Sequence, residues 1–334
     1  MFSSNTTIIL GAGASYDFGA PLGEELWRRV IQNSSSLVAV YEQFWDRPVV
    51  GGVERFLQSQ KTPNPKAFAY FSTLKGMEGD VHASATSVAE TIRRANFHTS
   101  VDDFLRDNPS LRDPVRTLIA AVLFEGLYEQ HERSWQLRRG CFEPSFQSPW
   151  RAGTVENWIR LFVGVCRPLV LKAQTLTPVQ VISFNYDRLL QTLLQQMWPV
   201  AERDYPPLDQ CFQFHYPYGA FSELPTELHD SSTWILQQFE NLGLADGTGS
   251  SVVDEVRAAI DEADQVFSVG FSWTETNLQL LGISAGGEKF HVQNFGGQDA
   301  RLARTLSRLG IFKTDAGSMS DLVRNGFFEQ RTGL

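Results

Sequence analysis

The feature that most constrains this chain is a short β-branched run that passes directly into a glycine-rich turn. Thr6–Leu10 has the composition of a buried strand, and Gly11–Ser15, with the sequence GAGAS, follows without a spacer. Beyond the turn, Leu22, Leu26 and Val30 recur at four-residue spacing, which is typical of a helix. A strand, a glycine turn and a helix in this order predict the first unit of a Rossmann-like sheet.

Strand-then-helix patterns recur in the second half of the chain. A β-rich run before Asn185 gives way to an apolar helix, and a run before Gly270 ends in another glycine turn. Alternating strands and helices imply an α/β fold with a Rossmann-like, doubly wound parallel sheet, whose ligand crevice lies at the carboxyl ends of the strands. The predicted later strands are Val179–Phe184, Phe212–Phe214, Gln265–Val269 and, as the last, Phe290–Gln293.

The pattern changes between these parts of the chain. From about residue 34 to residue 150, helical stretches alternate with polar loops, and Asp113 followed by Pro114 is a typical helix start. We therefore predict a single domain over residues 1–334, with a mostly helical insertion at about 34–150 and C-terminal helices over 298–334.

Charge and hydropathy exclude several classes of partner. The net charge of −9 and the pI near 5.2 leave no basic field, so direct nucleic-acid binding is not expected. No apolar stretch approaches the roughly 20 residues that span a bilayer. The run Thr6–Leu10 follows no basic segment and precedes no small-residue cleavage site, so we interpret it as a strand and not as a signal peptide. We expect a cytoplasmic protein.

Metal and disulfide sites are not expected either. Cys141, Cys166 and Cys211 are widely spaced and odd in number, which suits neither a disulfide framework nor a paired-cysteine zinc site. Buried free thiols are the expected state of these residues. The histidines other than His215 match no metal-ligand spacing.

The glycine turn alone is compatible with several nucleotide sites. Backbone amides in such a turn approach a phosphate closely and the helix N-terminus adds partial positive charge, a role that suits Gly11 and Gly13. The dehydrogenase fingerprint needs a third glycine three residues after the second, where this chain has Tyr16, and an acidic residue about 20 residues on, which is missing. A hydride-transfer enzyme is therefore disfavoured.

The turn also resembles the opening motif of the sirtuin family, in which a glycine-alanine-glycine-x-serine loop and a nearby glycine-x-proline step hold NAD. In this chain the loop is Gly11–Ser15 and the step is Gly19–Pro21. Ser100–Leu105 is similar to a segment of the prokaryotic, phage-defence-associated branch of that family, which lacks the zinc module. The resemblance spans residues 8–295 and leaves most of the insertion unaccounted for.

Three further motifs resemble the family pattern and follow in the family's order. Asn185-Tyr186-Asp187 resembles its asparagine-x-aspartate motif, and Gly270-Phe271-Ser272 resembles its glycine-x-serine ribose turn. Asn294 resembles the asparagine on the adenosine side. The resemblance thus implies the NAD-binding set Gly11, Ala12, Gly13, Ser15, Asp102, Asp187, Gly270, Ser272 and Asn294.

Cleavage of the nicotinamide–ribose bond requires polar groups that fix the ribose and a water molecule, because the reacting carbon becomes oxocarbenium-like. Asn185 suits this role, since an amide offers a donor and an acceptor without adding charge; its alternative is a helix cap or turn residue. Asp187 and Asp102 suit either hydrogen bonds to ribose hydroxyls or the orientation of the loops, and Asp187 equally suits a cap on the following helix.

The general base is expected to be His215, whose unperturbed pKa lies near cellular pH. The family places a histidine directly before glycine, whereas this chain has Tyr218 before Gly219. Three alternatives follow: His215 reaches the pocket by a changed loop path, Tyr218 replaces it, or catalysis is impaired. The structural alternative for His215 is a histidine whose hydrogen bonds are satisfied at a strand end. A phenol with a pKa near 10 is a poor base at neutral pH, which favours His215.

Protein deacylases of the sirtuin family carry a zinc module held by two cysteine pairs, which this chain lacks. We therefore expect an NAD glycohydrolase that converts NAD, its substrate, to nicotinamide and ADP-ribose without a metal. The alternative is a non-catalytic module that senses NAD or an ADP-ribose derivative, which the displaced histidine favours. An NAD-dependent protein deacylase is less favoured.

The resemblance to the phage-defence branch also implies regulation, in which an antiviral effector depletes NAD only after a trigger. The segment after residue 297 is short for a separate sensor domain. Control is therefore expected from homo-oligomerisation or from a separate sensor or activator protein.

Overall fold

The computed structural model of the protein describes residues 2, 4–16, 22–32, 34, 81–94, 101–112, 115, 118–119, 122, 158–173, 176–198, 205–220, 250–285, 287–294, 300–312, 314–317 and 319–328. The chain forms two compact units. Unit 1 consists of residues 1–18, 146–218 and 247–334, and unit 2 consists of residues 19–145 and 219–246.

Unit 1 is built on a six-stranded, all-parallel sheet in the order β3-β2-β1-β4-β5-β6. This is the strand order of a doubly wound dinucleotide-binding sheet, and it confirms the predicted α/β, Rossmann-like fold. The order reverses between β1 and β4, where such sheets bind ligands beyond the strand carboxyl ends. The strands are β1 (Thr6–Leu10), β2 (Val179–Ser183), β3 (Phe212–His215), β4 (Gln265–Val269), β5 (Phe290–Asn294) and β6 (Thr314–Ala316).

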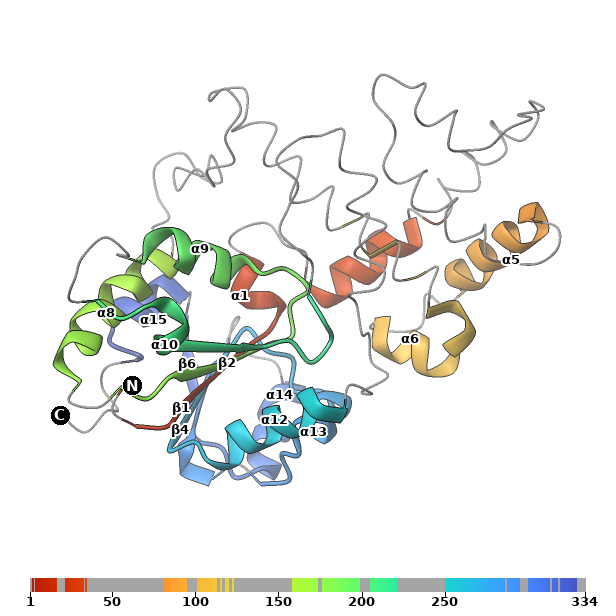
Figure 1. The fold of residues 1–334 in the computed structure, drawn as a ribbon. Coiled ribbons are helices and arrows are strands. Elements are labelled where there is room, and N and C mark those ends of the chain that lie inside the picture. The colour runs from red at the N-terminus through yellow and green to blue at the C-terminus, as the bar shows by residue number, and fades with distance from the viewer. Residues whose placement is uncertain are drawn as a thin grey trace, which may run out of the picture. The chain divides into compact units, whose positions relative to one another are not determined.

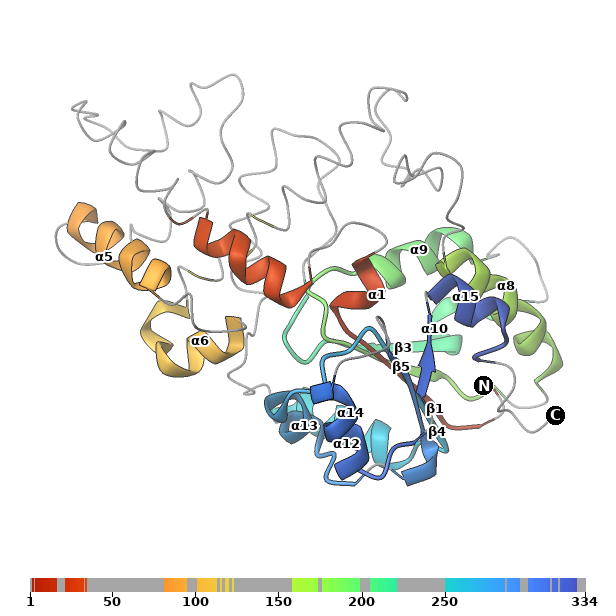
Figure 2. The same cartoon turned by 180° about the vertical axis from the view of Figure 1, so that it is seen from behind.

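Helices cover both faces of this sheet. Figures 1 and 2 show α8, α9 and α15 on one face and α12, α13 and α14 on the other. The described helices of unit 1 are α1 (Ala12–Tyr16), α8 (Trp158–Lys172), α9 (Leu189–Met197), α10 (Leu208–Cys211), α12 (Ser250–Asp261), α13 (Glu275–Leu281), α14 (Ala300–Arg308) and α15 (Met319–Arg324), with a 3-10 turn at Gly287–Lys289.

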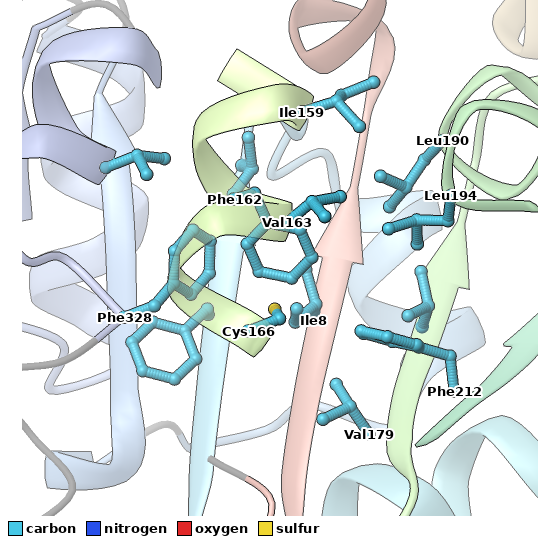
Figure 3. Close-up of a cluster of buried hydrophobic side chains, with 14 of the residues drawn as sticks. Ile8, Ile159, Phe162, Val163, Cys166, Val179, Leu190, Leu194, Phe212 and Phe328 are labelled. Carbon is cyan, nitrogen blue, oxygen red and sulfur yellow. The ribbon is translucent and has the colours of Figure 1, made fainter. Parts of the chain in front are cut away.

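The strands are buried because both faces are covered, which explains their nearly continuous apolar sequences. Alternate side chains enter the two cores: Ile8 of β1 belongs to the core under α8 and α9, and Ile9 belongs to the core under α12 to α14. Figure 3 shows the first core, in which Phe162 and Cys166 of α8 lie over Ile8. This layered packing fixes the carboxyl edge of the sheet, where the candidate residues lie.

Unit 2 is helical in its described residues. It contains helical residues 23–32, α5 (Val81–Arg94), α6 (Val101–Asp107) and a 3-10 turn at Pro109–Leu111. Trp27 and Phe104 pack with their ring centroids 4.8 Å apart, and both are buried. The exact limits of the insertion, 34 and 150, stay a prediction.

Two elements differ from the sequence-based expectation. The glycine turn is not a free loop, because α1 begins at Ala12, inside the turn itself. The last strand is β6, not Phe290–Gln293, so the prediction of the final strand was wrong. β6 has three residues, too few to produce a period of two that a sequence pattern can reveal.

Within the described ranges, none of the helices combines the length and the apolar character needed to cross a bilayer.

Candidate functional site

Parallel pairing brings three turns to one edge of the sheet. Leu10, the last residue of β1, is in register with Ser183 of β2 and with Val269 of β4. The turns that follow these three strands therefore lie side by side. They contain Gly11–Ser15, Asn185–Asp187 and Gly270–Ser272, three of the sequence motifs.

The first and third of these turns interlock through their backbones. The Gly11 amide donates to the Val269 carbonyl and the Gly13 amide to the Gly270 carbonyl, both at 3.0 Å. Added β-carbons would lie 2.4 Å from the Gly270 carbonyl oxygen at Gly11 and 2.7 Å from the Gly270 Cα at Gly13. Gly270 itself has a φ of +56°. Glycine is therefore required here by backbone packing.

The same hydrogen bonds bear on the expected NAD-binding role of this turn, which stays a prediction. The amides of Gly11 and Gly13 were expected to approach a phosphate, but both already donate to backbone carbonyls. The Ala14 amide is also occupied, by the Gly11 carbonyl at 2.9 Å. These three donors are thus not available to an anion in this structure, because each N–H supplies a single hydrogen.

A buried glutamine holds the Gly270 turn from the other side. Gln293 of β5 accepts from the Gly270 amide at 3.1 Å and donates to the Gly317 carbonyl at 3.0 Å. Ser272 is exposed, and its carbonyl accepts from the Asn277 side chain at 2.8 Å. Gln293 and Asn277 thus fix the shape of this turn, and the sequence motifs included neither of them.

The first and second turns are joined by a chain of side-chain hydrogen bonds. The Asn185 amide nitrogen donates to Ser15 Oγ at 2.9 Å, and Ser15 Oγ donates to Asp187 Oδ1 at 3.1 Å. Asn185 and Ser15 are buried, at 7% and 4% exposure, and Asp187 is partly buried. The structure therefore brings Ser15 to Asn185 and Asp187, which lie 170 and 172 residues further along the chain.

These three side chains line one pocket on the α8 and α9 face of the sheet. Its empty space is about 300 Å³, counting the part open to solvent. The enclosed part of this space is only about 10 Å³, roughly enough for one water molecule, so a nucleotide would require the lining side chains to move. Other polar lining comes from Ser183, Arg188 and Tyr216, and apolar lining comes from Leu10, Ala14, Trp158, Ile159, Leu189, Leu190 and Phe214.

Asp187 bonds the start of the following helix, one of the two roles that the sequence left open, and its role toward a ribose stays a prediction. Its Oδ1 accepts from the Leu189 amide at 3.0 Å, which caps the start of α9, and also from Ser15. Burial raises the pKa of the Asp187 carboxyl above its ordinary value, and the hydrogen bonds from Leu189 and Ser15 oppose this rise. Asp187 is therefore a carboxylate of increased proton affinity inside the pocket.

His215 lies on the opposite face of the sheet and does not line the pocket. Its Nε2 donates to Gln180 Oε1 at 2.8 Å, and its Nδ1 lies 3.5 Å from Glu255 Oε2. Burial lowers the pKa of this imidazole, while Glu255 opposes the shift. In β3, Phe214 faces the pocket and its neighbour His215 faces α12, because successive side chains alternate. The structure does not bring His215 to Asn185.

Tyr218, the other candidate base, is buried among side chains of the same opposite core. Its hydroxyl donates to Asn277 Oδ1 at 2.8 Å. Asn277 in turn holds the Ser272 carbonyl. Tyr218 therefore links the loop after β3 to the turn after β4.

Trp158, Arg188 and Tyr216 are pocket residues that sequence reasoning missed. The indole nitrogen of Trp158 donates to the Ala14 carbonyl at 2.9 Å and so anchors α8 to the glycine turn. The Arg188 guanidinium lies 5.5 Å from the centroid of the Tyr216 ring. Arg188 directly follows the asparagine-x-aspartate motif, and this adjacency was the available signal.

Two predicted site residues cannot be placed in this arrangement. Asp102 falls in α6 and Asn294 ends β5, but both side chains lie outside the described residues. Of the remaining predicted residues, Ala12 contributes backbone to the first turn of α1. In the described part of the chain, no group of three or more His, Cys, Asp or Glu side chains is arranged to hold a metal ion.

Comparison with known proteins adds no family to this description. No protein-family model matches the chain, and no curated protein matches it.

Proposed function

We propose that this chain is an NAD glycohydrolase, which splits NAD into nicotinamide and ADP-ribose. The observation that carries the proposal is the hydrogen-bonded chain from Asn185 through Ser15 to Asp187 in one pocket at the carboxyl edge of a doubly wound sheet. This edge is where folds of this class bind nucleotides. The sequence resemblance to sirtuins supports NAD as the substrate.

The chemistry requires water to attack C1′ of the ribose while the bond from C1′ to the nicotinamide nitrogen breaks. The bonding electrons leave with nicotinamide, and the attacking water loses a proton. Asn185 suits the positioning of ribose or water, because no described residue donates to its amide oxygen. Its amide nitrogen is held by Ser15, which fixes the orientation of the side chain.

Asp187 takes the role of proton acceptor in this proposal. Among the described residues that line the pocket it is the acidic one, whereas His215 is directed to the other face. Its negative charge also stabilises the positive charge that develops at C1′. A raised pKa brings a carboxylate closer to the proton affinity that general bases need near neutral pH.

The direct test is Asn185→Ala, measured by chromatographic detection of nicotinamide. We expect a loss of at least about 100-fold in kcat, because positioning and polar stabilisation of this kind typically contribute that much. Asn325→Ala, which changes an exposed asparagine after α15, is the matched control and should retain activity. Equal NAD consumption by Asn185→Ala and wild type would contradict the proposal.

A second candidate function is a non-catalytic module that binds NAD or an ADP-ribose derivative. The placement of His215 away from the pocket favours it, since no described residue supplies an imidazole there. Titration calorimetry separates the two functions. Tight NAD binding without nicotinamide release, in every oligomeric state of the protein, would favour the sensor.

The biological role that follows from the first candidate is regulated depletion of NAD in antiviral defence. The resemblance to the phage-defence branch supports this role. Control by homo-oligomerisation or by a separate activator protein belongs to the same proposal.

A further inference from the structure

The occupied glycine turn raises the question of where a nucleotide's phosphates would bind. The amides of Gly11, Gly13 and Ala14 all donate to backbone carbonyls. A diphosphate placed near Asp187 would also be repelled by its carboxylate. A phosphate-bearing ligand of this pocket therefore needs a positive charge from another source.

We infer that Arg188 binds the phosphate groups of the ligand at this pocket. The inference rests on the proposed function for the identity of the ligand, a nicotinamide dinucleotide. Among the described residues that line the pocket, Arg188 is the basic one. Its guanidinium forms no ion pair with a described acidic residue, although Asp187 precedes it in the sequence.

Tyr216 positions the guanidinium of Arg188. The guanidinium carbon lies 5.5 Å from the centroid of the Tyr216 ring, within the range of a cation–π contact. The ring is itself fixed, because its hydroxyl donates to Gln191 Oε1 of α9 at 2.9 Å. Burial raises the pKa of the Tyr216 phenol, so this group stays neutral and adds no negative charge.

The geometry of the group matches a diphosphate. A guanidinium presents its N–H donors in a planar fork, which engages two phosphate oxygens at once. No described residue accepts a hydrogen bond from this guanidinium, so its donors remain available to the ligand. The pocket then divides by charge: Asp187 and Asn185 take the ribose side, and Arg188 takes the phosphates.

The test compares ligands that differ in phosphate content, using calorimetry on the full chain. ADP-ribose and inorganic pyrophosphate carry two phosphate groups, and nicotinamide riboside carries none. Arg188→Gln should weaken ADP-ribose binding by about tenfold to a hundredfold, as expected for a charged hydrogen bond. Binding of nicotinamide riboside should change by less than about twofold.

Two further variants serve as controls. Arg160→Gln removes the same charge from an exposed position on α8 that does not line the pocket, and it should leave both affinities unchanged. Arg188→Lys keeps the charge without the fork and should recover only part of the affinity. Pyrophosphate binding that depends on Arg188 identifies phosphate itself as the recognised group. ADP-ribose binding without pyrophosphate binding shows that the nucleoside must be attached.

The inference and the proposed function fail in different ways. The inference is overturned if Arg188→Gln binds ADP-ribose as tightly as wild type, or if this variant binds all the ligands more weakly by the same factor. NAD cleavage is tested separately, by Asn185→Ala. If ADP-ribose binds through Arg188 but NAD is never cleaved, the inference is supported and the hydrolase is overturned.

Discussion

Ser15 is the residue on which the candidate site depends most directly. A hydroxyl can both accept and donate a hydrogen bond. Ser15 accepts one from the Asn185 amide and donates one to the Asp187 carboxylate. Alanine can make neither of these hydrogen bonds, and a side chain that only accepts cannot donate to Asp187. The chain of bonds also strengthens its members, because each bond polarises the next.

Asp187→Asn separates the acid–base role of this position from its structural role. An asparagine still accepts from Leu189 and Ser15, but it cannot take a proton from water. We expect kcat to fall by about 10²–10⁴-fold with the fold intact. Wild-type activity should rise with pH through the raised pKa of Asp187, as the carboxylate forms. An active Asp187→Asn enzyme would contradict this assignment.

The same variant has a signature in stability. Because the folded-state pKa of Asp187 is raised above its unfolded value, its contribution to stability is full below the unfolded pKa, about 3.9, and is lost as pH rises through the folded pKa. Urea unfolding between pH 4 and pH 7 should therefore show the variant gaining stability relative to wild type as pH rises. A constant difference across that range is the contrary result.

For His215 we expect the opposite pH dependence of the free energy of unfolding. Its folded-state pKa is lowered, so its contribution is present above the unfolded pKa of about 6.5 and is lost as pH falls through the folded pKa. In His215→Gln, the loss of unfolding free energy on acidification should be smaller than in wild type. NAD cleavage near neutral pH should persist, since His215 lies on the other face. Loss of cleavage in a well-folded variant would restore this histidine as the base.

At the scale of elements, the contact between the turns after β1 and β4 decides the geometry of the edge. Three glycines meet there because backbone approaches backbone, and Gln293 of β5 secures the same turn. The contact holds α1 in place, and α1 carries Ser15. The position of the Ser15 hydroxyl thus depends on packing between two turns far apart in the sequence.

Gly270→Ala tests this contact. The new β-carbon would lie 2.4 Å from the backbone of Gly13 and Ala14, at a φ of +56° that alanine avoids. We expect a loss of about 3 kcal/mol or more in the free energy of unfolding, measured in urea. Gly164→Ala, in an open position of α8, is the control and should gain about 0.5–1 kcal/mol. Equal stability of the two variants would contradict the packing argument.

At the scale of the whole molecule, the described fold separates a sheet unit that contains the candidate pocket from a second unit of helices. All described pocket-lining residues belong to the sheet unit. Under the proposed function, we expect regulation to reach this unit from elsewhere in the chain, from another copy or from a partner.

This arrangement leads to a prediction about assembly. The isolated monomer should cleave NAD slowly, and activity should rise in a larger assembly or with an activator protein. Mass photometry run beside a nicotinamide-release assay measures both quantities on the same sample. Full activity in a uniform monomer peak would contradict regulated assembly.

Much of the fold was predictable from local pattern. β1, β2, β4 and β5 were recognisable because a doubly covered parallel strand is almost continuously apolar. The strand-then-helix alternation predicted the parallel sheet, and the polar residues after each strand predicted that Asn185, Asp187 and Ser15 share one edge. β6 was missed, because three residues carry no usable period.

Tertiary structure alone decided which face each side chain takes and which donors are already used. Phe214 and His215 are neighbours in sequence, yet one lines the pocket and the other bonds Gln180, because a shift of one residue reverses the face of a strand. The glycines of the first turn have the spacing of a phosphate-binding loop. In the structure, however, their amides donate hydrogen bonds to carbonyls of β4 and of the turn that follows it. Local sequence determines the propensity of a segment, whereas hydrogen-bond partners and faces depend on segments that are distant in the chain.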